Sequence, residues 1–410
     1  MGLDDMENRL NAAGYGQAEG NPAVVVAVVD SGVSNNRYIN GRLLTGYNYV
    51  AQNTNTGDDD GHGTHVAGTI CDGTPQRVKI LPVKVLGANG KGTVLNIRNG
   101  IEYAISQGAD VINMSLGGEN IGQTADYFDS SLQKAYQRGI TVVVAAGNSS
   151  MDTQYAYPAN NPHVLTIAAL DESMSLAEYS NYGDDVDFAL PGSNIQSCVP
   201  TGIEAMNGTS MAAPHAAAAA ASLKCWNPDL DPDTMKNILI NYSVDLGDSY
   251  LYGNGWINFR RFYLVSYNAN GGSGGPYFQL KNPGTNMTLS TAAPTRSSET
   301  EIGAYTVTLN ANGGSVSQSA LKADRTTTYT FRNWNTKADG TGRSWSAGES
   351  YTADADLALW AQWDSSTTGA SVTLPEATRE NSSTGSYTIT LDANGGTVSQ
   401  RSICLLLQAF

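Results

Sequence analysis

The sequence predicts an α/β domain with a mostly parallel sheet covered by helices on both faces, followed by small C-terminal β-rich repeat modules. Two observations predict the first part: uninterrupted apolar runs that end in a polar residue, such as residues 23–29 before Asp30, and helix-patterned segments that alternate with them. Runs that are apolar on both faces are typical of central parallel strands, and strand–helix alternation favours right-handed crossovers. A third observation, a change of composition to Ser, Thr, Gly, Asn and Tyr after Tyr263, predicts the second part.

The expected elements follow one another along the first 263 residues. Strands are expected at residues 23–29, 78–86, 110–118, 140–148, 163–169 and 186–189, and helices at residues 3–15, from 66 onward, 93–107, 126–138 and 211–224. The strands are expected where β-branched and other apolar residues run together. Two of the helices end at Gly108 and Gly139, and glycine readily adopts the conformation that ends a helix. The last helix is rich in alanine, a strong helix former, and it follows a Gly-Thr-Ser sequence that places Ser210 at its start.

Composition excludes several classes of protein. The formal net charge is −15 and no basic patch stands out, which argues against a nucleic-acid partner. No apolar run approaches the roughly 20 residues of a membrane span, and the polar first 20 residues do not read as a signal peptide. Four scattered cysteines, Cys71, Cys198, Cys225 and Cys404, could form one bridge but are expected as buried free thiols. We expect a monomer that is secreted or associated with the cell surface.

An aspartate and two histidines stand at the ends of expected elements. Asp30 ends the first strand, where open α/β sheets gather functional groups, although a turn-forming aspartate before glycine explains it almost as well. His62 lies between Gly61 and Gly63, which allow close backbone approach, and His65 follows three residues later. A metal site would need a third ligand at suitable spacing, and none follows. His62 is therefore the candidate base, and His65 is expected to be a structural histidine of the helix.

Ser210 supplies a hydroxyl at a helix start, where the N-terminus favours an anion. A serine hydroxyl is a weak nucleophile, so it needs a base and a third group that orients the base. Asp30, His62 and Ser210 occur in this order, separated by 32 and 148 residues. The aspartates at residues 58–60 are expected to form a solvated loop, with a weaker case for contact with a cation.

These motifs resemble those of the subtilisin-like serine peptidases over about residues 3–263. The resemblance is carried by VDSGV at 29–33, HGTHVAG at 62–68, SLG at 115–117, AAGN at 145–148, GTSMAAP at 208–214 and YGNGWIN at 252–258. It implies an endopeptidase in which Ser210 attacks the scissile carbonyl, His62 takes and returns the proton, and Asp30 orients the imidazole.

The resemblance also implies the residues that bind substrate. Asn148 and the backbone N–H of Ser210 should form the oxyanion hole. The substrate should pair as an added strand with Ser115, Leu116 and Gly117, and the primary pocket should be walled by Ala145, Ala146 and Gly147, with Ala156 near its base. The small side chain of Ala156 predicts room for a large hydrophobic residue before the scissile bond.

This chemistry requires no cofactor. Many relatives carry a longer, Asn-containing loop that binds structural calcium, but only six residues, 72–77, separate Cys71 from Val78 here, so the sequence does not support a calcium ion in this loop. Many relatives also fold with the help of a propeptide, and none precedes the catalytic segment in this sequence. The expected partners are polypeptide substrates, with a propeptide and cell-surface components as further candidates.

Three copies of a short motif organise the rest of the chain, at residues 263–272, 305–314 and 387–396. Each is an alternating strand that runs into an Asn-Gly turn, which is a strong hairpin signal. The copies resemble the B-type repeats of internalin-like bacterial surface proteins. We divide the chain into a peptidase domain (1–263), a partial repeat and linker (264–304), a complete β-rich repeat (305–363), a Ser/Thr-rich linker (364–386) and a truncated repeat (387–410).

Two alternatives to a hydrolase stay open at this point. The chain could be a surface binding protein with an inactive or immature protease-like domain, although the intact triad weighs against this. It could also be a peptide ligase or cyclase on the same fold, which would differ only in how the acyl-enzyme is resolved.

Overall fold

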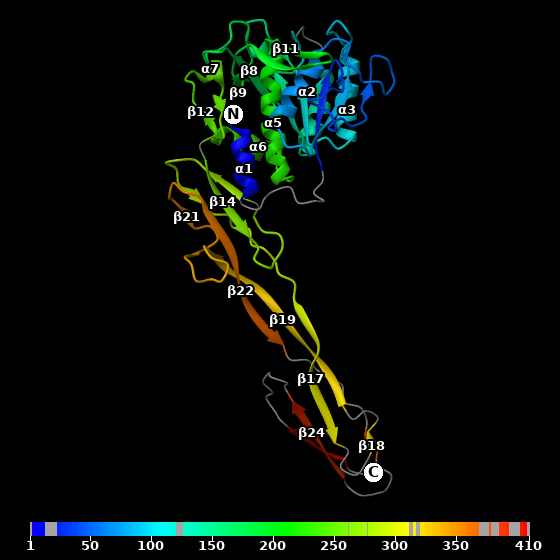
Figure 1. Ribbon diagram of the computed structural model, residues 1–410, viewed down its shortest axis with the longest axis vertical. Coiled ribbons are helices and arrows are strands. Elements are labelled where there is room, and N and C mark those ends of the chain that lie inside the picture. Colours follow the sequence, from blue (N-terminus) through cyan, green and yellow to red (C-terminus); the bar gives the residue numbers. More distant parts are fainter. Residues whose placement is uncertain are drawn as a thin grey trace. The chain divides into compact units, whose positions relative to one another are not determined.

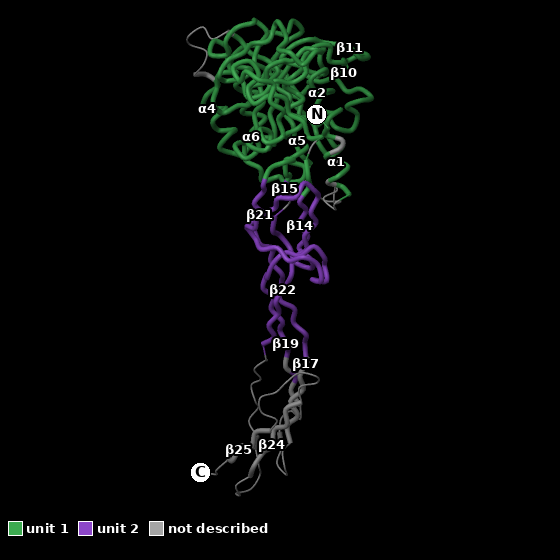
Figure 2. Tube along the Cα trace, turned by 90° about the vertical axis from the view of Figure 1, so that its left-hand side faces the viewer, with its two compact units in different colours: residues 1–264, 280–285 green, residues 265–279, 286–410 purple. Residues whose placement is uncertain are grey.

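The computed structural model describes residues 2–12, 23–119, 126–260, 262–276, 278–310, 315–316, 320–368, 377–378, 385–392 and 402–407. The chain divides into two compact units, which Figure 2 colours separately: unit 1 comprises residues 1–264 and 280–285, and unit 2 comprises residues 265–279 and 286–410. The predicted helix at 3–15 and the predicted truncated repeat at 387–410 lie partly outside the described residues.

Unit 1 is built on a seven-stranded sheet in the order β2-β3-β1-β4-β6-β8-β9 (Figure 1), and every neighbouring pair is parallel. The strands are β1 (Val24–Asp30), β2 (Tyr47–Asn48), β3 (Val78–Lys84), β4 (Val111–Met114), β6 (Thr141–Ala145), β8 (Leu165–Leu170) and β9 (Phe188–Pro191). The prediction of a mostly parallel sheet is confirmed. Strands β4 and β6 end earlier than predicted, because the chain leaves the sheet there for the glycine-containing loops at residues 115–118 and 146–149.

Helices cover both faces of this sheet. Helices α3 (Val94–Ser106) and α4 (Asp126–Gln137) share one hydrophobic core with residues of β1, β4 and β6. Helices α2 (His62–Asp72) and α5 (Thr209–Trp226) pack together on the other face, and α5 contacts most strands of the sheet. Helix α5 is buried along almost its whole length, and its run of alanines allows this close packing. None of the described helices is long and apolar enough to cross a membrane.

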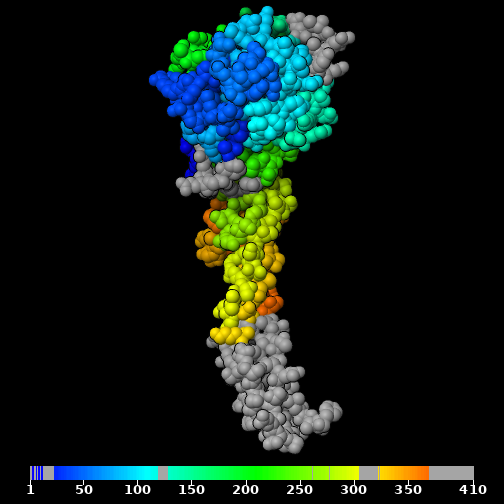
Figure 3. Space-filling model, turned by 90° about the vertical axis from the view of Figure 1, so that its right-hand side faces the viewer, coloured from blue at the N-terminus to red at the C-terminus, as the bar shows by residue number. Residues whose placement is uncertain are grey.

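On the face that Figure 3 shows, the blue to cyan segments of unit 1 lie next to one another. Smaller elements complete unit 1. These elements are the helices α1 (Leu3–Leu10), α6 (Pro232–Asn241) and α7 (Ser249–Tyr252), the 3-10 turn η2 (Thr153–Tyr155), and the antiparallel pairs β5 (Gly118–Glu119) with β7 (Ala156–Tyr157), β10 (Ile195–Val199) with β11 (Gly202–Met206), and β12 (Ser243–Val244) with β13 (Trp256–Ile257).

Unit 2 is a β-structure, as the alternating motifs predict. Its main sheet has the order β15-β14-β22-β19-β17-β24-β25, with β20 paired to β19. The strands in this part of the chain are β14 (Tyr263–Asn268), β15 (Phe278–Lys281), β16 (Met287–Thr288), β17 (Glu299–Asn310), β18 (Ser315–Val316), β19 (Ala320–Asn335), β20 (Ser344–Trp345), β21 (Ser350–Tyr351), β22 (Leu357–Thr368), β23 (Ala377–Thr378), β24 (Gly385–Asp392) and β25 (Ser402–Leu407). Outside the main sheet, β16 pairs with β21 and β18 pairs with β23.

The hydrophobic core of unit 2 joins two segments of the sequence. Val265 and Tyr267 of β14 and the nearby Leu289 are buried together with Trp334 of β19 and Leu359 of β22. Strand β14 is parallel to β22, so an early strand lies beside a strand almost 100 residues later. The segment 264–304 therefore contributes apolar side chains to the same core as residues 331–363.

In unit 1, a buried arginine holds the short connection between α2 and β3. The side chain of Arg42 is 1% exposed. Its Nη1 donates to Cys71 O at 2.7 Å and to Thr74 Oγ1 at 3.1 Å, and its Nη2 donates to the carbonyls of Thr74 and Pro75. One guanidinium therefore bonds the carbonyl groups with which the chain leaves α2, in addition to the backbone N–H groups of Thr74 and Val78 that donate to the carbonyls of Cys71 and Pro75.

We expect the Arg42→Met substitution to lower the free energy of unfolding by about 3 kcal/mol, because it removes the charge-assisted hydrogen bonds of a buried guanidinium to three carbonyl groups and one hydroxyl. The matched control is Arg37→Met, which removes an exposed guanidinium from the same segment and should change stability by less than about 0.5 kcal/mol. Thermal or denaturant unfolding of the two variants checks this. Equal stability of the two variants would contradict the role of Arg42.

Candidate active site

Asp30 and His62 meet where β1 ends and α2 begins. Asp30 is the last residue of β1 and fully buried, and its Oδ1 accepts a hydrogen bond from the backbone N–H of Ser31 at 2.6 Å. The same oxygen lies 2.8 Å from Nδ1 of His62, the first residue of α2. Gly63 makes this approach feasible, because a Cβ there would lie 2.2 Å from the carbonyl oxygen of Gly32 and 3.1 Å from Asp30 Oδ1. The imidazole is thereby held with its Nε2 as the remaining available nitrogen.

A second carboxylate, that of Asp58, ties the same two element ends together. Its Oδ1 accepts from Ser31 Oγ at 2.9 Å and from the N–H groups of Asp60 and Gly61 at 3.1 and 2.9 Å. Its Oδ2 accepts from the N–H and the hydroxyl of Thr64 at 2.9 and 2.6 Å. A carboxylate at a helix N-terminus satisfies unpaired N–H groups and complements the helix dipole. The expectation of a solvated loop is therefore wrong for Asp58, which is only 8% exposed.

The charges around His62 change its basicity. Burial of the imidazole by itself lowers the pKa, but the charge of Asp30 and its hydrogen bond, together with the charges of Asp60 and Asp58, outweigh it and raise the pKa from 6.5 to about 9. These carboxylates stabilise the protonated imidazole. The site therefore favours the imidazolium that proton abstraction would create, and the neutral base becomes abundant only on the alkaline side.

Ser210 lies in the first turn of α5, next to the loop that follows β4. Its Oγ donates to the carbonyl oxygen of Ser115 at 3.1 Å, and the Ser115 hydroxyl donates to the carbonyl oxygen of Ser210 at 2.8 Å. Asn113 of β4 in turn donates to the Ser115 hydroxyl at 3.0 Å. No hydrogen bond joins the described side chains of Ser210 and His62, so the hydroxyl must turn away from Ser115 before a proton can pass to the imidazole.

Asn148 is oriented from the start of α5. The N–H and the hydroxyl of Thr209 donate to Asn148 Oδ1 at 2.8 and 2.9 Å. A backbone N–H can only donate, so the oxygen of the amide must face Thr209, and its NH₂ group remains available as a donor. Asn148 and Ser210 both line one cavity.

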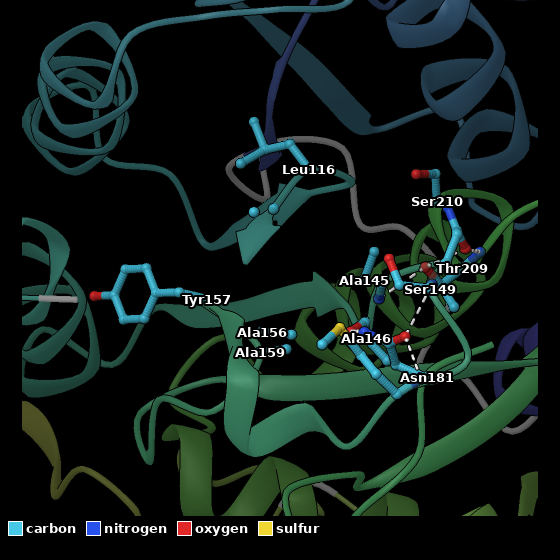
Figure 4. Close-up of a pocket in the computed structure, with 15 residues that line it drawn as sticks. Leu116, Ala145, Ala146, Ser149, Ala156, Tyr157, Ala159, Asn181, Thr209 and Ser210 are labelled. Carbon is cyan, nitrogen blue, oxygen red and sulfur yellow. Dashed lines mark hydrogen bonds between the residues drawn. The ribbon is translucent and has the colours of Figure 1, made fainter. Parts of the chain in front are cut away.

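This cavity has a volume of about 200 Å³ and contains no charged residue among those that line it (Figure 4). The predicted residues that line it are Leu116, Gly117, Ala145, Ala146, Gly147, Asn148 and Ala156. Ser115 does not line it but contacts Ser210 directly. The antiparallel pairing of Gly118 with Tyr157 joins the two segments that border the cavity.

Several residues that line the cavity were missed by the sequence analysis: Gly118, Ser149, Met151, Tyr157, Ala159, Asn181 and Thr209. Ser149 and Thr209 adjoin motifs that were recognised, and their position next to Asn148 and Ser210 could have indicated them. Asn181 follows Asn148 by 33 residues and has no local signal. Figure 4 shows the ring of Tyr157 extending away from Ser210, and its hydroxyl donates to Asp129 at 2.7 Å.

The remaining candidate polar groups are engaged within the protein. Nε2 of the buried His65 lies 2.9 Å from the carbonyl oxygen of Ile195 in the β10–β11 hairpin, as expected for a structural histidine. Asp59 pairs with Nζ of Lys84 at 2.6 Å. The described residues contain no cluster of three or more potential metal-ligating side chains. In the loop after Cys71, the guanidinium of Arg42 bonds the carbonyl oxygens of Cys71, Thr74 and Pro75.

Comparisons with known proteins identify the family of the chain. The Subtilase family (Peptidase_S8) matches residues 21–255, and the Listeria-Bacteroides repeat domain matches residues 305–362. Subtilisin BL of Lederbergia lenta is 38% identical over 244 residues, covering 57% of this chain and 88% of that protein. Subtilisin DY of Bacillus licheniformis is 36% identical over 263 residues, covering 61% of this chain and 93% of that protein.

Solved structures show the same relationship. The crystal structure of a cold adapted subtilisin-like serine proteinase matches with a TM-score of 0.53 and 36% identity, covering 58% of this chain and 87% of that chain. That of a lanthipeptide protease, at 24% identity and a TM-score of 0.56, shows the shared fold. The chain therefore belongs to the subtilase family and is a subtilisin-like serine endopeptidase with a surface-type repeat domain in its C-terminal part.

Proposed function

We propose that Ser210, His62 and Asp30 form the catalytic triad of this peptidase. The observation that carries the proposal is the 2.8 Å contact between Asp30 Oδ1 and His62 Nδ1, which leaves Nε2 to serve a nucleophile. Ser210 Oγ attacks the scissile carbonyl while His62 takes its proton, and His62 then protonates the leaving amine. Water attacks the acyl-enzyme by the same path. Asp30 keeps the imidazole in one tautomer and stabilises its charge.

Asn148 and the backbone N–H of Ser210 would hold the oxyanion of the tetrahedral intermediate. Thr209 keeps the oxygen of the Asn148 amide turned to itself, so the NH₂ group is the part that can donate. The N–H of Ser210 lies in the first turn of α5, where backbone donors have no carbonyl within the helix. Donors that are fixed before the reaction stabilise a developing charge without reorganisation.

The cavity beside Ser210 would accept the side chain that precedes the scissile bond. Its uncharged lining and the small Ala156 at its border support a preference for large hydrophobic residues. The bound peptide would pair as an added strand with Ser115, Leu116 and Gly117.

The physiological setting is a further part of the proposal. The family membership and the match to a surface-type repeat domain at residues 305–362 support a secreted or cell-surface protein. The repeats would serve surface association or spacing. We keep the domain boundaries after residues 263, 304, 363 and 386 as a proposal from the sequence.

The first test uses a fluorophosphonate probe and unfolded casein. The native protein should be labelled and should cleave casein, whereas Ser210→Ala should lose labelling and on the order of 10⁶-fold of the activity. If the native protein is neither labelled nor able to cleave casein, although circular dichroism shows that it is folded, the proposed triad is contradicted.

The ratio of hydrolysis to transfer onto an added peptide amine distinguishes a peptidase from a ligase, and we expect hydrolysis to dominate.

The pH dependence provides a second test. Because His62 must be neutral to accept a proton and its pKa is raised, kcat/KM should fall as pH drops through this pKa, well above 6.5. Asp60→Asn removes one of the charges that raise this pKa, so the acidic limb should move to lower pH and kcat/KM on that limb should rise about twofold. Asp72→Asn, an exposed carboxylate at the far end of α2, is the control and should leave the limb in place.

Filling the cavity tests the substrate preference. Ala156→Leu should reduce kcat/KM about tenfold or more for substrates with Phe before the scissile bond, and much less for those with Ala. The ratio of the two kcat/KM values is the readout, because it does not depend on the amount of active enzyme. An unchanged ratio would place the specificity pocket elsewhere.

A further inference from the structure

Asn148 lies on a segment that has no regular secondary structure. Residues 146–151 connect the end of β6 to the turn η2, so the sheet and helices offer few partners to their backbone N–H and C=O groups. Those of its backbone groups that are buried must be satisfied by other parts of the chain. The position of Asn148 therefore depends on whatever supplies those partners.

One side chain, that of Asn181, supplies three of them. Its Nδ2 donates to the carbonyl oxygen of Ala146 at 2.9 Å, and its Oδ1 accepts from the N–H groups of Ser149 and Met151 at 2.9 and 3.1 Å. The backbone partners determine which atom of the amide is oxygen, because an N–H must donate and a carbonyl must accept. Figure 4 shows Asn181 close to Ala146 and Ser149, with dashed lines for its hydrogen bonds to the segment.

Asn181 is also held tightly against the segment. Its side chain is 2% exposed, and its own backbone N–H donates to the carbonyl oxygen of Gly147 at 2.9 Å. A Cβ at Gly147 would lie 2.3 Å from Asn181 Nδ2, and Gly147 has a φ of 106°, so only glycine fits this approach. The amide of Asn181 is thus enclosed by the segment whose shape it maintains.

From its other side, the segment is held by Thr209. Gly147 N–H donates to Thr209 Oγ1 at 3.1 Å, and Thr209 donates to Asn148 Oδ1. Thr209 therefore sets the rotation of the Asn148 amide, while Asn181 sets the course of the backbone that carries it. The two contacts together fix the NH₂ group of Asn148 relative to Ser210.

We propose that Asn181 is a positioning residue of the peptidase, which acts on the oxyanion through Asn148. This inference rests on the proposed role of Asn148 in the oxyanion hole. In the described structure, the side-chain hydrogen bonds of Asn181 go to backbone groups of Ala146, Ser149 and Met151 and not to the nucleophile or His62, so any effect on the rate must pass through residues 146–151.

The test is a double-mutant cycle on the full chain with a fluorogenic peptide that has Phe before the scissile bond. Asn181→Leu has nearly the size of the native side chain but makes none of its hydrogen bonds, and it should lower kcat about tenfold. Asn148→Ala should lower kcat about 10²–10³-fold. In the Asn148→Ala background, Asn181→Leu should change kcat by less than about twofold, because the group that it positions is gone.

Asn48→Leu is the matched control. Asn48, the last residue of β2, is buried and makes the same three kinds of bond to a loop outside the cavity: Nδ2 donates to Asn55 O at 2.7 Å, and Oδ1 accepts from the N–H groups of Val50 and Ala51, both at 2.9 Å. Its replacement should lower the melting temperature about as much as Asn181→Leu, yet leave kcat per titrated active site within about twofold of the native value.

The outcomes separate the two proposals. An equal loss of kcat from Asn181→Leu in both backgrounds, or a kcat loss in Asn48→Leu as large as in Asn181→Leu, would overturn the positioning role. An unchanged kcat in Asn148→Ala alone would instead overturn the proposed oxyanion hole. If Asn181→Leu does not fold, the same cycle is run with Asn181→Asp, which keeps the acceptor for Ser149 and Met151 but cannot donate to Ala146 when ionised; its kcat loss should likewise require Asn148.

Discussion

The buried carboxylate of Asp58 is the contact on which the arrangement of the site depends. It accepts hydrogen bonds from the Ser31 hydroxyl just after β1 and from N–H groups at the start of α2, so one charged group joins a strand end to a helix start. Hydrogen bonds to a charged acceptor are stronger than those between neutral groups, and an anion at a helix N-terminus is favourable. Asp30 and His62 each lie one residue from these anchor points, so their contact follows from the same network.

Three irregular segments of unit 1 are held by buried polar side chains in a comparable way. Asn48, Asn181 and Arg42 each satisfy several backbone groups of a loop that lacks strand partners. A buried backbone group without a partner costs about 1–3 kcal/mol, so each of these side chains stabilises one loop conformation over its alternatives. The consequence for function is that a loop can hold an amide such as that of Asn148 in place almost as firmly as a strand could.

Unit 2 differs from unit 1 in its composition and in the kind of core that stabilises it. Its strands are rich in Ser and Thr, and its core is a small aromatic cluster in which Trp334 and Tyr267 meet edge to face with centroids 4.9 Å apart. Aromatic side chains bury a large area per residue, which suits a module with few apolar positions. The core takes residues from strands far apart in the sequence, so the repeat motifs do not by themselves delimit the packed module.

The sequence alone determined the parallel sheet, most of its helices and the three motifs around Asp30, His62 and Ser210, because apolar runs, terminating glycines and short motifs are local signals. It did not indicate that Asp58 is buried, because the contact that joins this carboxylate to the end of β1 is made by Ser31, 27 positions away. Nor did it indicate Asn181 or Arg42, whose partners lie about 30 residues along the chain. Only the tertiary structure decided these contacts, because folding determines which unpaired backbone groups lie next to a buried amide or guanidinium.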